Sequence, residues 1–552
     1  MMSESYDSVE QVKARGARSR GECAKLFRLC GRGKGRVARD PEGRAQVDRA
    51  TPRPGRTTER ERRSEVPVGF PRCNVQGVAA LGRWWDQSGA RARVRTGTPY
   101  RIGRDMDFFR IQGGRRLAGR IAIEGSKNAA LPLMAAALLT DQPVTLRNVP
   151  CLSDINNMGR LLKELGVEQA GECGTIRLTS MDENQVHARY DIVRTMRASI
   201  CCLGPMLARR KRAVIAMPGG CAFGSRPVDL HLRGMQALGA KVELNGGDIV
   251  VSAQRLKGNT IFLGGPFGST VLGTANVMSA ATLAQGRTII ECAACEPEIV
   301  DLANLLNAMG AKIRGAGGPR LIIDGVEELG GAEHTVMSDR IVAGTYAVAA
   351  AITNGDVILD DFPYDSLLAA IDRLNEIGVH VERLNVSDDV TEGMERCSVR
   401  VTSERQLKPT TITTQPHPGF PTDLQAQFMT LLCLAQGNSI ITEKIYPERF
   451  MHVAELSRMG AKLYRQGPTV MVIGGTPLRG APVMASDLRA SASMVLAGLA
   501  AEGETIVSRI YHLDRGYTRM EEVLNLLGAK IERFRPEADE AKRIENAMSG
   551  AE

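Results

Sequence analysis

The sequence predicts an α/β fold of two inside-out barrel domains, in which helices form the core and small β-sheets face the solvent. Three observations lead to this prediction: a unit recurs six times, its helices lack a polar face, and its strands alternate apolar and polar residues. A chain of 552 residues is also too long for one ordinary core. We therefore expect three units in each of two domains.

The repeated unit is recognised by a helix that ends in an apolar–Gly–apolar step and continues into a strand. The signature glycines are separated by 73, 71, 68, 82 and 68 residues and are Gly166, Gly239, Gly310, Gly378, Gly460 and Gly528. Glycine just after a helix commonly takes the left-handed conformation that ends it. We expect that conformation at these positions.

A second shared part lies upstream of this signature, where a helix of small residues leads into a short strand. Five copies are found at 131–150, 278–293, 346–361, 428–443 and 494–509. These helices are rich in Ala, Leu and Met and offer no polar face to water, whereas the strands have one polar face. The sequence therefore predicts six βαβαββ-type repeats with buried helices and outer sheets.

The domain boundaries follow from the repeats. Residues 127–337 are expected to form the first domain, residues 106–126 with 338–535 the second, and residues 536–552 a flexible tail. Residues 1–105 hold 24 Lys and Arg against 12 Asp and Glu and show no sustained period, so we interpret them as a disordered basic leader. A tail for RNA or membranes is one alternative. Another is that Met106 is the true start and the leader is absent from the native protein.

Charge and motifs exclude several classes of protein. Without its leader the chain has a net charge of about −3, which does not suit a nucleic-acid surface. Phosphate-loop and dinucleotide-binding motifs are missing, and the Cys292–Cys295 pair has no second pair to complete a zinc site. We find no signal peptide or membrane segment. We therefore expect a cytoplasmic protein, with no nucleic-acid or membrane partner, whose cysteines are thiols.

Two of four unusual clusters lie in the first domain. In 125–132, Lys127 and Asn128 come at the start of a buried helix, where a cation beside helical N–H groups suits an anion. In 218–231, a glycine-rich loop holds Cys221 and Arg226, and the guanidinium can lower the pKa of a nearby thiol and bind phosphate. A solvated lysine and a small buried cysteine are the structural alternatives.

The other two clusters lie in the second domain. In 417–427, two prolines fix a loop before Asp423, which is either a first-turn helix charge or a general base. Arg449, Arg489 and Arg515 stand at helix starts or loops, and several arginines together indicate a polyanionic substrate.

At these clusters the sequence resembles the UDP-N-acetylglucosamine 1-carboxyvinyltransferase family, enolpyruvyl transferases of peptidoglycan synthesis. The resemblance covers residues 106 to 535. The motifs that carry it are GSKNAALP (125–132), RTMRASI (194–200), PGGCAFGSRPVDLH (218–231), EPEIVD (296–301), HPGFPTDLQAQF (417–428), ERFMHVAELSRMGA (448–461) and DLRASASMVLAG (487–498). It implies the enolpyruvyl transferase fold, phosphoenolpyruvate and UDP-N-acetylglucosamine as substrates, and no metal or organic cofactor.

The resemblance also implies roles for individual residues. Lys127, Arg226 and Arg515 would bind the phosphate and carboxylate of phosphoenolpyruvate, with Arg449 and Arg489 nearby. Asp423 would accept the proton of the sugar 3-hydroxyl, and Cys221 would protonate C3 or take part in covalent handling of phosphoenolpyruvate. The sugar-nucleotide site would be lined by Asn128, Arg197, Asp229, Leu230, Asp423 and Ile445, and Pro227 and Val228 would be further substrate-binding residues. Segment 262–278 is longer and richer in glycine than the stretch usual in the family.

Three other functions stay open at this point. The shikimate-pathway enolpyruvyl transferase is the nearest rival, and the loop cysteine with the PTDLQAQ segment favours the amino-sugar enzyme. A noncatalytic scaffold is disfavoured by the presence of Lys127, Cys221, Arg226 and Asp423. A nucleic-acid binder is disfavoured by the charge of the body.

Because the leader has no core-forming period, we expect it to be dispensable. A chain that begins at Met106 should fold and turn over substrate like the full chain. Circular dichroism and steady-state kinetics on both chains check this. A loss of solubility or turnover in the shorter chain would contradict it.

Overall fold

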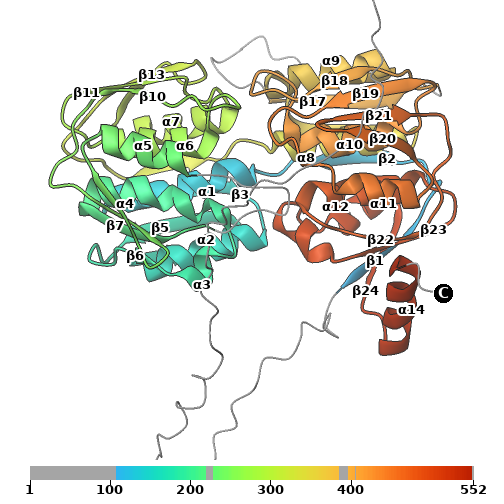
Figure 1. Ribbon diagram of the computed structural model, residues 1–552, viewed down its shortest axis with the longest axis horizontal. Coiled ribbons are helices and arrows are strands. Elements are labelled where there is room, and N and C mark those ends of the chain that lie inside the picture. The colour runs from blue at the N-terminus through green and yellow to red at the C-terminus, as the bar shows by residue number, and fades with distance from the viewer. Residues whose placement is uncertain (1–106, 219–227, 385–395, 405, 550–552) are drawn as a thin grey trace, which may run out of the picture. The chain divides into compact units, whose positions relative to one another are not determined.

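The computed structural model describes residues 107–218, 228–384, 396–404 and 406–549, which belong to one compact unit of the chain (Figure 1). The leader and the loop that contains Cys221, Arg226 and Pro227 lie outside the described residues. Within the described part, six four-stranded sheets share one arrangement: an edge strand runs parallel to its neighbour, and two antiparallel pairings follow. The fold predicted from the repeats is confirmed.

Three of the sheets are built from residues between 144 and 335. In spatial order their strands are β14 (Ala332–Thr335), β3 (Val144–Val149), β5 (Gly174–Ser180) and β4 (Val167–Ala170); β6 (His187–Ala188), β7 (Arg212–Ala216), β9 (Asp248–Ser252) and β8 (Lys241–Asn245); β10 (Thr260–Phe262), β11 (Arg287–Glu291), β13 (Arg320–Asp324) and β12 (Lys312–Arg314).

The other three sheets combine later residues with the first two strands of the described chain. Their strands are β18 (Thr411–Thr413), β19 (Asn438–Thr442), β21 (Thr469–Ile473) and β20 (Lys462–Gln466); β22 (Pro482–Met484), β23 (Glu504–Ser508), β1 (Phe108–Gln112) and β24 (Lys530–Phe534); β16 (Val379–Arg383), β17 (Arg396–Ser403), β15 (Asp356–Pro363) and β2 (Ala118–Ala122). We call the part from 127 to 337 the first half, and 107–126 with 338–535 the second half.

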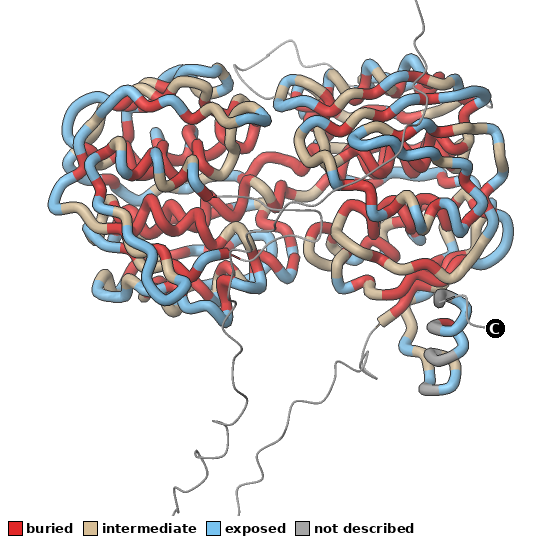
Figure 2. The backbone as a smooth tube through the Cα atoms, viewed as in Figure 1, coloured by how far each residue is buried: buried red, intermediate tan, exposed pale blue. Residues whose placement is uncertain are grey.

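Each repeat contributes one inner helix, most of whose residues are buried, and one outer helix (Figure 2). The inner helices are α1 (Lys127–Ala136), α4 (Leu203–Arg210), α6 (Val271–Ala281), α8 (Arg340–Ile352), α10 (Gln425–Leu432) and α12 (Leu488–Ala500). The outer helices are α2 (Ser153–Glu164), α5 (Asp229–Ala237), α7 (Pro297–Ala308), α9 (Leu368–Ile377), α11 (His452–Arg458) and α13 (Met520–Leu526). Helix α3 (Tyr190–Val193) is a single turn before α4.

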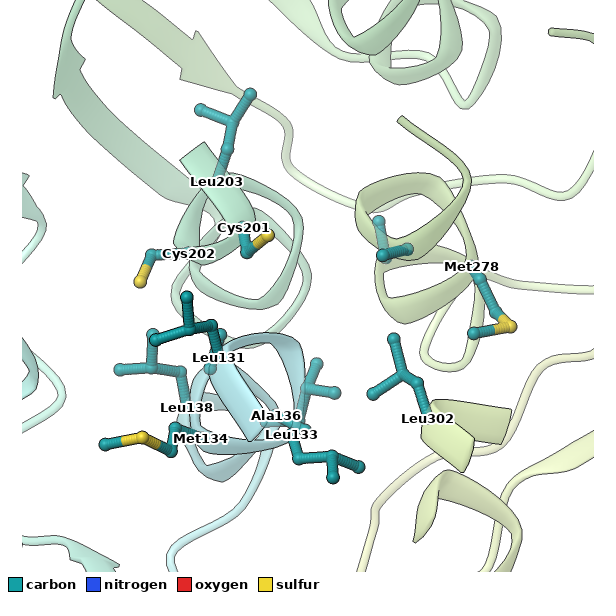
Figure 3. Close-up of a cluster of buried hydrophobic side chains, with 14 of the residues drawn as sticks. Leu131, Leu133, Met134, Ala136, Leu138, Cys201, Cys202, Leu203, Met278 and Leu302 are labelled. Atoms are coloured by element: carbon teal, nitrogen blue, oxygen red, sulfur yellow. The ribbon is translucent and has the colours of Figure 1, made fainter. Parts of the chain in front are cut away.

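The buried side chains form one large core in each half. The first runs from Ala129 to Met337 and the second from Phe109 to Ile531. Figure 3 shows part of the first core, where Leu131, Leu133, Met134, Ala136 and Leu138 lie near Cys201, Cys202, Leu203, Met278 and Leu302. Small residues let the inner helices approach closely, which explains their Ala-rich sequences. That each half behaves as an independent domain stays a prediction.

The repeat glycines have the backbone conformation expected of them. Their φ angles are +77°, +92°, +104°, +98°, +92° and +98° at Gly166, Gly239, Gly310, Gly378, Gly460 and Gly528. An L side chain is strained in this left-handed region, so glycine ends each of these helices at little conformational cost. The prediction of left-handed glycine caps is confirmed.

The two halves are joined where the chain crosses between them twice. The backbone N–H of Ser126 donates to the carbonyl of Met337 at 2.7 Å, and the N–H of Asp339 donates to the carbonyl of Glu124 at 2.9 Å. Asp339 then caps a helix from each half: one carboxylate oxygen accepts from the N–H groups of Ile341 and Val342 in α8, and the other from the N–H of Lys127 in α1.

Two expectations differ from the structure. Cys151 and Cys173 form a disulfide, with their Cα atoms 5.0 Å apart, rather than two thiols. Fold topology causes this, because the loop after β3 lies beside the turn between β4 and β5. The expected flexible tail contains helix α14 (Ala538–Ser549), which buries Ile544 against Phe108 and Ile506. Among the described residues, no helix is long and apolar enough to cross a membrane.

The double cap predicts that Asp339 is important for stability. Replacing it with alanine should lower the free energy of unfolding by about 2–3 kcal/mol, because one helix cap is worth about 0.5–2 kcal/mol and the freed N–H groups are buried. Asp372→Ala is the control, since Asp372 is exposed and should change stability by less than about 0.5 kcal/mol. Urea unfolding followed by circular dichroism measures both. Equal midpoints for the two variants would contradict the double cap.

Candidate active site

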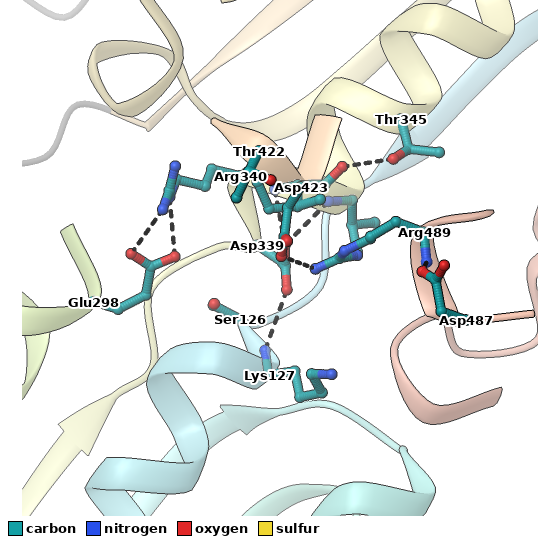
Figure 4. Close-up of polar contacts among 12 residues, drawn as sticks. Ser126, Lys127, Glu298, Asp339, Arg340, Thr345, Thr422, Asp423, Asp487 and Arg489 are labelled. Carbon is teal, nitrogen blue, oxygen red and sulfur yellow. Dashed lines mark hydrogen bonds and ion pairs between the residues drawn. The ribbon is translucent and has the colours of Figure 1, made fainter. Parts of the chain in front are cut away.

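The first turns of helices from both halves meet at the crossing between them. Asp339 links the starts of α8 and α1. Arg340 at the start of α8 forms a buried ion pair with Glu298 in the first turn of α7, through two hydrogen bonds of 2.9 and 3.2 Å (Figure 4). Because each helix presents its positive end here, the region favours negatively charged groups.

Asp423 lies in a short 3₁₀ turn (Thr422–Leu424) directly before α10, between two buried arginines. Arg449 donates to its Oδ1 atom at 2.7 Å, and Arg489 donates to its Oδ2 atom at 3.0 Å. The guanidinium groups of Arg489 and Arg449 outweigh the effect of burial and hold the pKa of Asp423 well below 3.8. Its side chain keeps 27% exposure, so this carboxylate is ionised and accessible.

A second carboxylate, Asp154 in the first turn of α2, brings two cations together across the halves. Lys127 from α1 lies 3.4 Å from its Oδ2 atom, and Arg515 from the second half donates to its Oδ1 atom at 3.0 Å. Burial lowers the pKa of Lys127, and the neighbouring charges of Arg489 and Arg515 lower it further, while Asp154 and Asp423 oppose the change. Lys127 therefore lies within electrostatic reach of Asp423.

The buried residue Glu443 connects the turn that carries Asp423 to the segment that contains Ile445 and Tyr446. Its Oε1 atom accepts from the backbone N–H groups of Ile445 and Tyr446 at 2.8 and 2.9 Å, and its Oε2 atom accepts from the hydroxyl of Thr422 at 2.9 Å. Arg449 donates to the same hydroxyl at 3.0 Å. Ile445 is thereby held close in the fold to the turn that carries Asp423.

The structure thus brings together Lys127, Asp423, Arg449, Arg489 and Arg515 among the residues singled out in the sequence. Asn128 is half-buried at the start of α1, next to Lys127.

The remaining described candidates lie in the first half. Val228 is the buried cap residue of α5, Asp229 is exposed and Leu230 is half-buried at its start. Arg197 lies in the 3₁₀ turn Arg197–Cys202 before α4. Burial lowers the pKa of His231 to about 4, and the positive charge of Arg197 adds to this effect.

Thr270, in the glycine-rich segment, accepts from the N–H of Gly273 as the N-cap of α6.

Sequence reasoning missed several residues of this region: Asp154, Glu298, Asp339, Arg340, Thr422, Glu443 and Tyr517. Asp339 and Asp154 each come at a helix start, which is a detectable signal, but many surface helices share it. The partners of the others are remote in sequence, so no local pattern identifies them.

The geometry combines an accessible ionised carboxylate with several cations at positive helix ends. Such a site can bind a phosphorylated or carboxylated substrate and accept a proton from a hydroxyl beside it. In the described ranges, no group of three or more His, Cys, Asp or Glu side chains is arranged to hold a metal ion.

Comparison with known proteins defines the class. The family described as EPSP synthase (3-phosphoshikimate 1-carboxyvinyltransferase) matches residues 111–524. In solved structures the fold is shared with the enolpyruvyl transferase NikO from Streptomyces tendae, at a TM-score of 0.69 and 23% identity over 78% of this chain and 100% of that one. EPSP synthase from Acinetobacter baumannii has a TM-score of 0.62 at 18% identity, over 78% and 100%. At these identities the likeness shows the fold alone.

Curated relatives are much closer in sequence. UDP-N-acetylglucosamine 1-carboxyvinyltransferase from Methylacidiphilum infernorum is 49% identical over 428 residues, which are 78% of this chain and 99% of that protein. The protein of the same name from Nitratidesulfovibrio vulgaris (strain Miyazaki F) is 51% identical over 429 residues, 78% and 100%. The chain therefore belongs to the UDP-N-acetylglucosamine 1-carboxyvinyltransferases, within the EPSP synthase family.

Proposed function

We propose that the chain transfers the enolpyruvyl group of phosphoenolpyruvate to the 3-hydroxyl of UDP-N-acetylglucosamine and releases phosphate, the first step of peptidoglycan synthesis. The observation that carries this proposal is Asp423: an accessible carboxylate, kept ionised by two arginines, lies within electrostatic reach of Lys127. A hydroxyl acceptor and an anionic donor can be bound side by side at such a place.

Phosphoenolpyruvate carries both a phosphate and a carboxylate and needs several cations. Lys127 and Arg515 converge on Asp154 from opposite halves, so they are placed to bind one anion together. The resemblance adds Arg226, which lies outside the described residues, and Arg449 and Arg489 contribute the positive charge that they hold beside Asp423. Asp154 keeps the side chains of Lys127 and Arg515 next to each other by pairing with both.

The reaction proceeds by addition and elimination. Asp423 takes the proton of the 3-hydroxyl while the oxygen forms a bond to C2 of phosphoenolpyruvate, and Cys221 donates a proton to C3. The tetrahedral intermediate then loses phosphate from C2 and a proton from C3, which restores the double bond. No electrons are gained or lost overall, so the reaction needs no redox partner.

The sugar nucleotide requires a longer surface than phosphoenolpyruvate. Asn128 beside Lys127 and Ile445 beside Thr422 flank the catalytic groups, and Glu443 fixes the backbone of Ile445. Arg197 and the start of α5, with Val228, Asp229 and Leu230, supply the part of the site in the first half. Both substrates are small and soluble, which supports a cytoplasmic location for the enzyme.

Phosphate release tests the proposed activity directly. The full chain should release phosphate when phosphoenolpyruvate and UDP-N-acetylglucosamine are both present, and shikimate 3-phosphate should not replace the sugar nucleotide. Asp423→Asn should lower kcat by about 10²–10⁴-fold, because an amide cannot accept the proton. Asp372→Asn, at an exposed site, is the control and should match the wild type. No phosphate release by the wild type, or full activity of Asp423→Asn, would overturn the proposal.

The reactive cysteine gives a second test. We expect the epoxide fosfomycin to label Cys221, as the family resemblance implies; by contrast, burial raises the pKa of Cys201 and Cys433 to about 12, which lowers the fraction of reactive thiolate at these two positions. Labelling should be faster with sugar nucleotide bound. Cys221→Asp keeps an acid but loses the sulfur, so it should retain turnover and resist fosfomycin. Intact mass and peptide mapping measure the adduct, and an adduct on another cysteine would disprove this assignment.

A further inference from the structure

A buried tyrosine contacts the arginine that binds Asp423. Tyr517 follows the 3₁₀ turn Ile510–Arg515 and is 1% exposed. Its hydroxyl lies 2.9 Å from Oγ1 of Thr345 and 3.1 Å from Nη1 of Arg489, and Nε2 of Gln427 lies 3.4 Å away. These partners come from three inner helices of the second half, α8, α12 and α10.

The donor and acceptor roles in this network can be assigned by counting hydrogens. The hydroxyl of Thr345 has one hydrogen and donates it to the carbonyl of Ile341 at 2.7 Å. The Tyr517 hydroxyl must therefore donate to Thr345, which leaves its lone pairs to accept from Arg489. Tyr517 thus gives Arg489 a fixed acceptor.

Arg489 is held between this acceptor and Asp423. Its Nη1 group donates to Tyr517 and its Nη2 group to Oδ2 of Asp423 at 3.0 Å, while the guanidinium carbon lies 5.6 Å from the centre of the tyrosine ring. The network also reaches the backbone, since Gln427 donates to the carbonyl of Asp423 at 2.9 Å and to Thr345 at 3.1 Å. Both the carboxylate and the main chain of Asp423 are tied to it.

We propose that Tyr517 is a positioning residue of the reaction: its hydroxyl fixes Arg489, and Arg489 fixes the orientation of the Asp423 carboxylate. The inference rests on the proposed function, because it takes Asp423 as the group that accepts the proton. Side-chain volume does not explain the hydroxyl, since phenylalanine would fill nearly the same buried space; what the hydroxyl adds is its hydrogen bonds to Thr345 and Arg489. A network of buried hydrogen bonds is instead suited to holding a charged group in one orientation.

The test compares two tyrosines in the same core. Tyr517→Phe removes the acceptor of Arg489 and keeps the ring, whereas Tyr346→Phe removes the hydroxyl of a buried tyrosine of α8 that makes none of the hydrogen bonds described above to Arg489, Thr345 or Gln427. We expect Tyr517→Phe to lower kcat about tenfold with the KM for UDP-N-acetylglucosamine changed by less than about threefold. Tyr346→Phe should keep the wild-type kcat. Thermal unfolding of both variants verifies that each is folded under the assay conditions.

A double-mutant cycle separates positioning through Arg489 from a merely structural effect. In an Arg489→Lys background, adding Tyr517→Phe should lower kcat by less than about twofold, because the hydroxyl no longer has the guanidinium to hold. Equal kcat values for Tyr517→Phe and Tyr346→Phe, or additive effects in the cycle, would overturn the proposal. A wild-type chain without turnover would instead refute the proposed function. The turnover of the wild type is therefore measured before that of any variant.

Discussion

The carboxylate of Asp339 caps an inner helix of each half at once, and the arrangement of the site follows from that contact. The first backbone N–H groups of a helix have no partner within the helix, so in a helix buried on every side they need an acceptor from elsewhere in the fold. Since the first N–H groups of α1 and α8 share one acceptor, the starts of these helices are fixed at the crossing between the halves. Lys127 and Arg340, the first residues of the two helices, are consequently buried there, and each finds a carboxylate partner on an outer helix.

This convergence sets the electrostatics of the site. Positive helix ends and buried cations accumulate in one place among several carboxylates, of which Asp154, Glu298 and Asp423 pair with the cations and Asp339 with helix N–H groups. Both carboxylate oxygens of Glu298 accept hydrogen bonds from Arg340. Asp154 and Asp423, by contrast, each bind two cations and bridge elements that are distant in sequence. Cations gathered at positive helix ends are what a substrate with phosphate and carboxylate groups requires.

The sequence revealed the repeats because each unit meets the same local demands: a helix without a polar face, a glycine after it and an alternating strand. Lys127, Asp423 and Arg489 were singled out because charge at the start of an apolar helix is a local signal, and Arg449 and Arg515 because several arginines occur together in the last repeats. Asp154 and Tyr517 were not, because their importance comes from Arg515, 361 residues from Asp154, and from Thr345, 172 residues from Tyr517. The Cys151–Cys173 disulfide and α14 were missed for a similar reason, as only the assembled sheets bring their partners near.

The two arginines that bind Asp423 have opposing effects on its role as a base. They keep the carboxylate ionised, yet by lowering its pKa they also make it a weak base. Proton transfer becomes easier if some of this positive charge is turned toward a substrate anion when Asp423 accepts the proton. Arg449 is anchored to Thr422 as well as to Asp423, whereas Arg489 donates at once to the Asp423 carboxylate and to the neutral hydroxyl of Tyr517. A neutral acceptor holds the guanidinium in place without competing strongly for its charge, which leaves that charge available to the reaction.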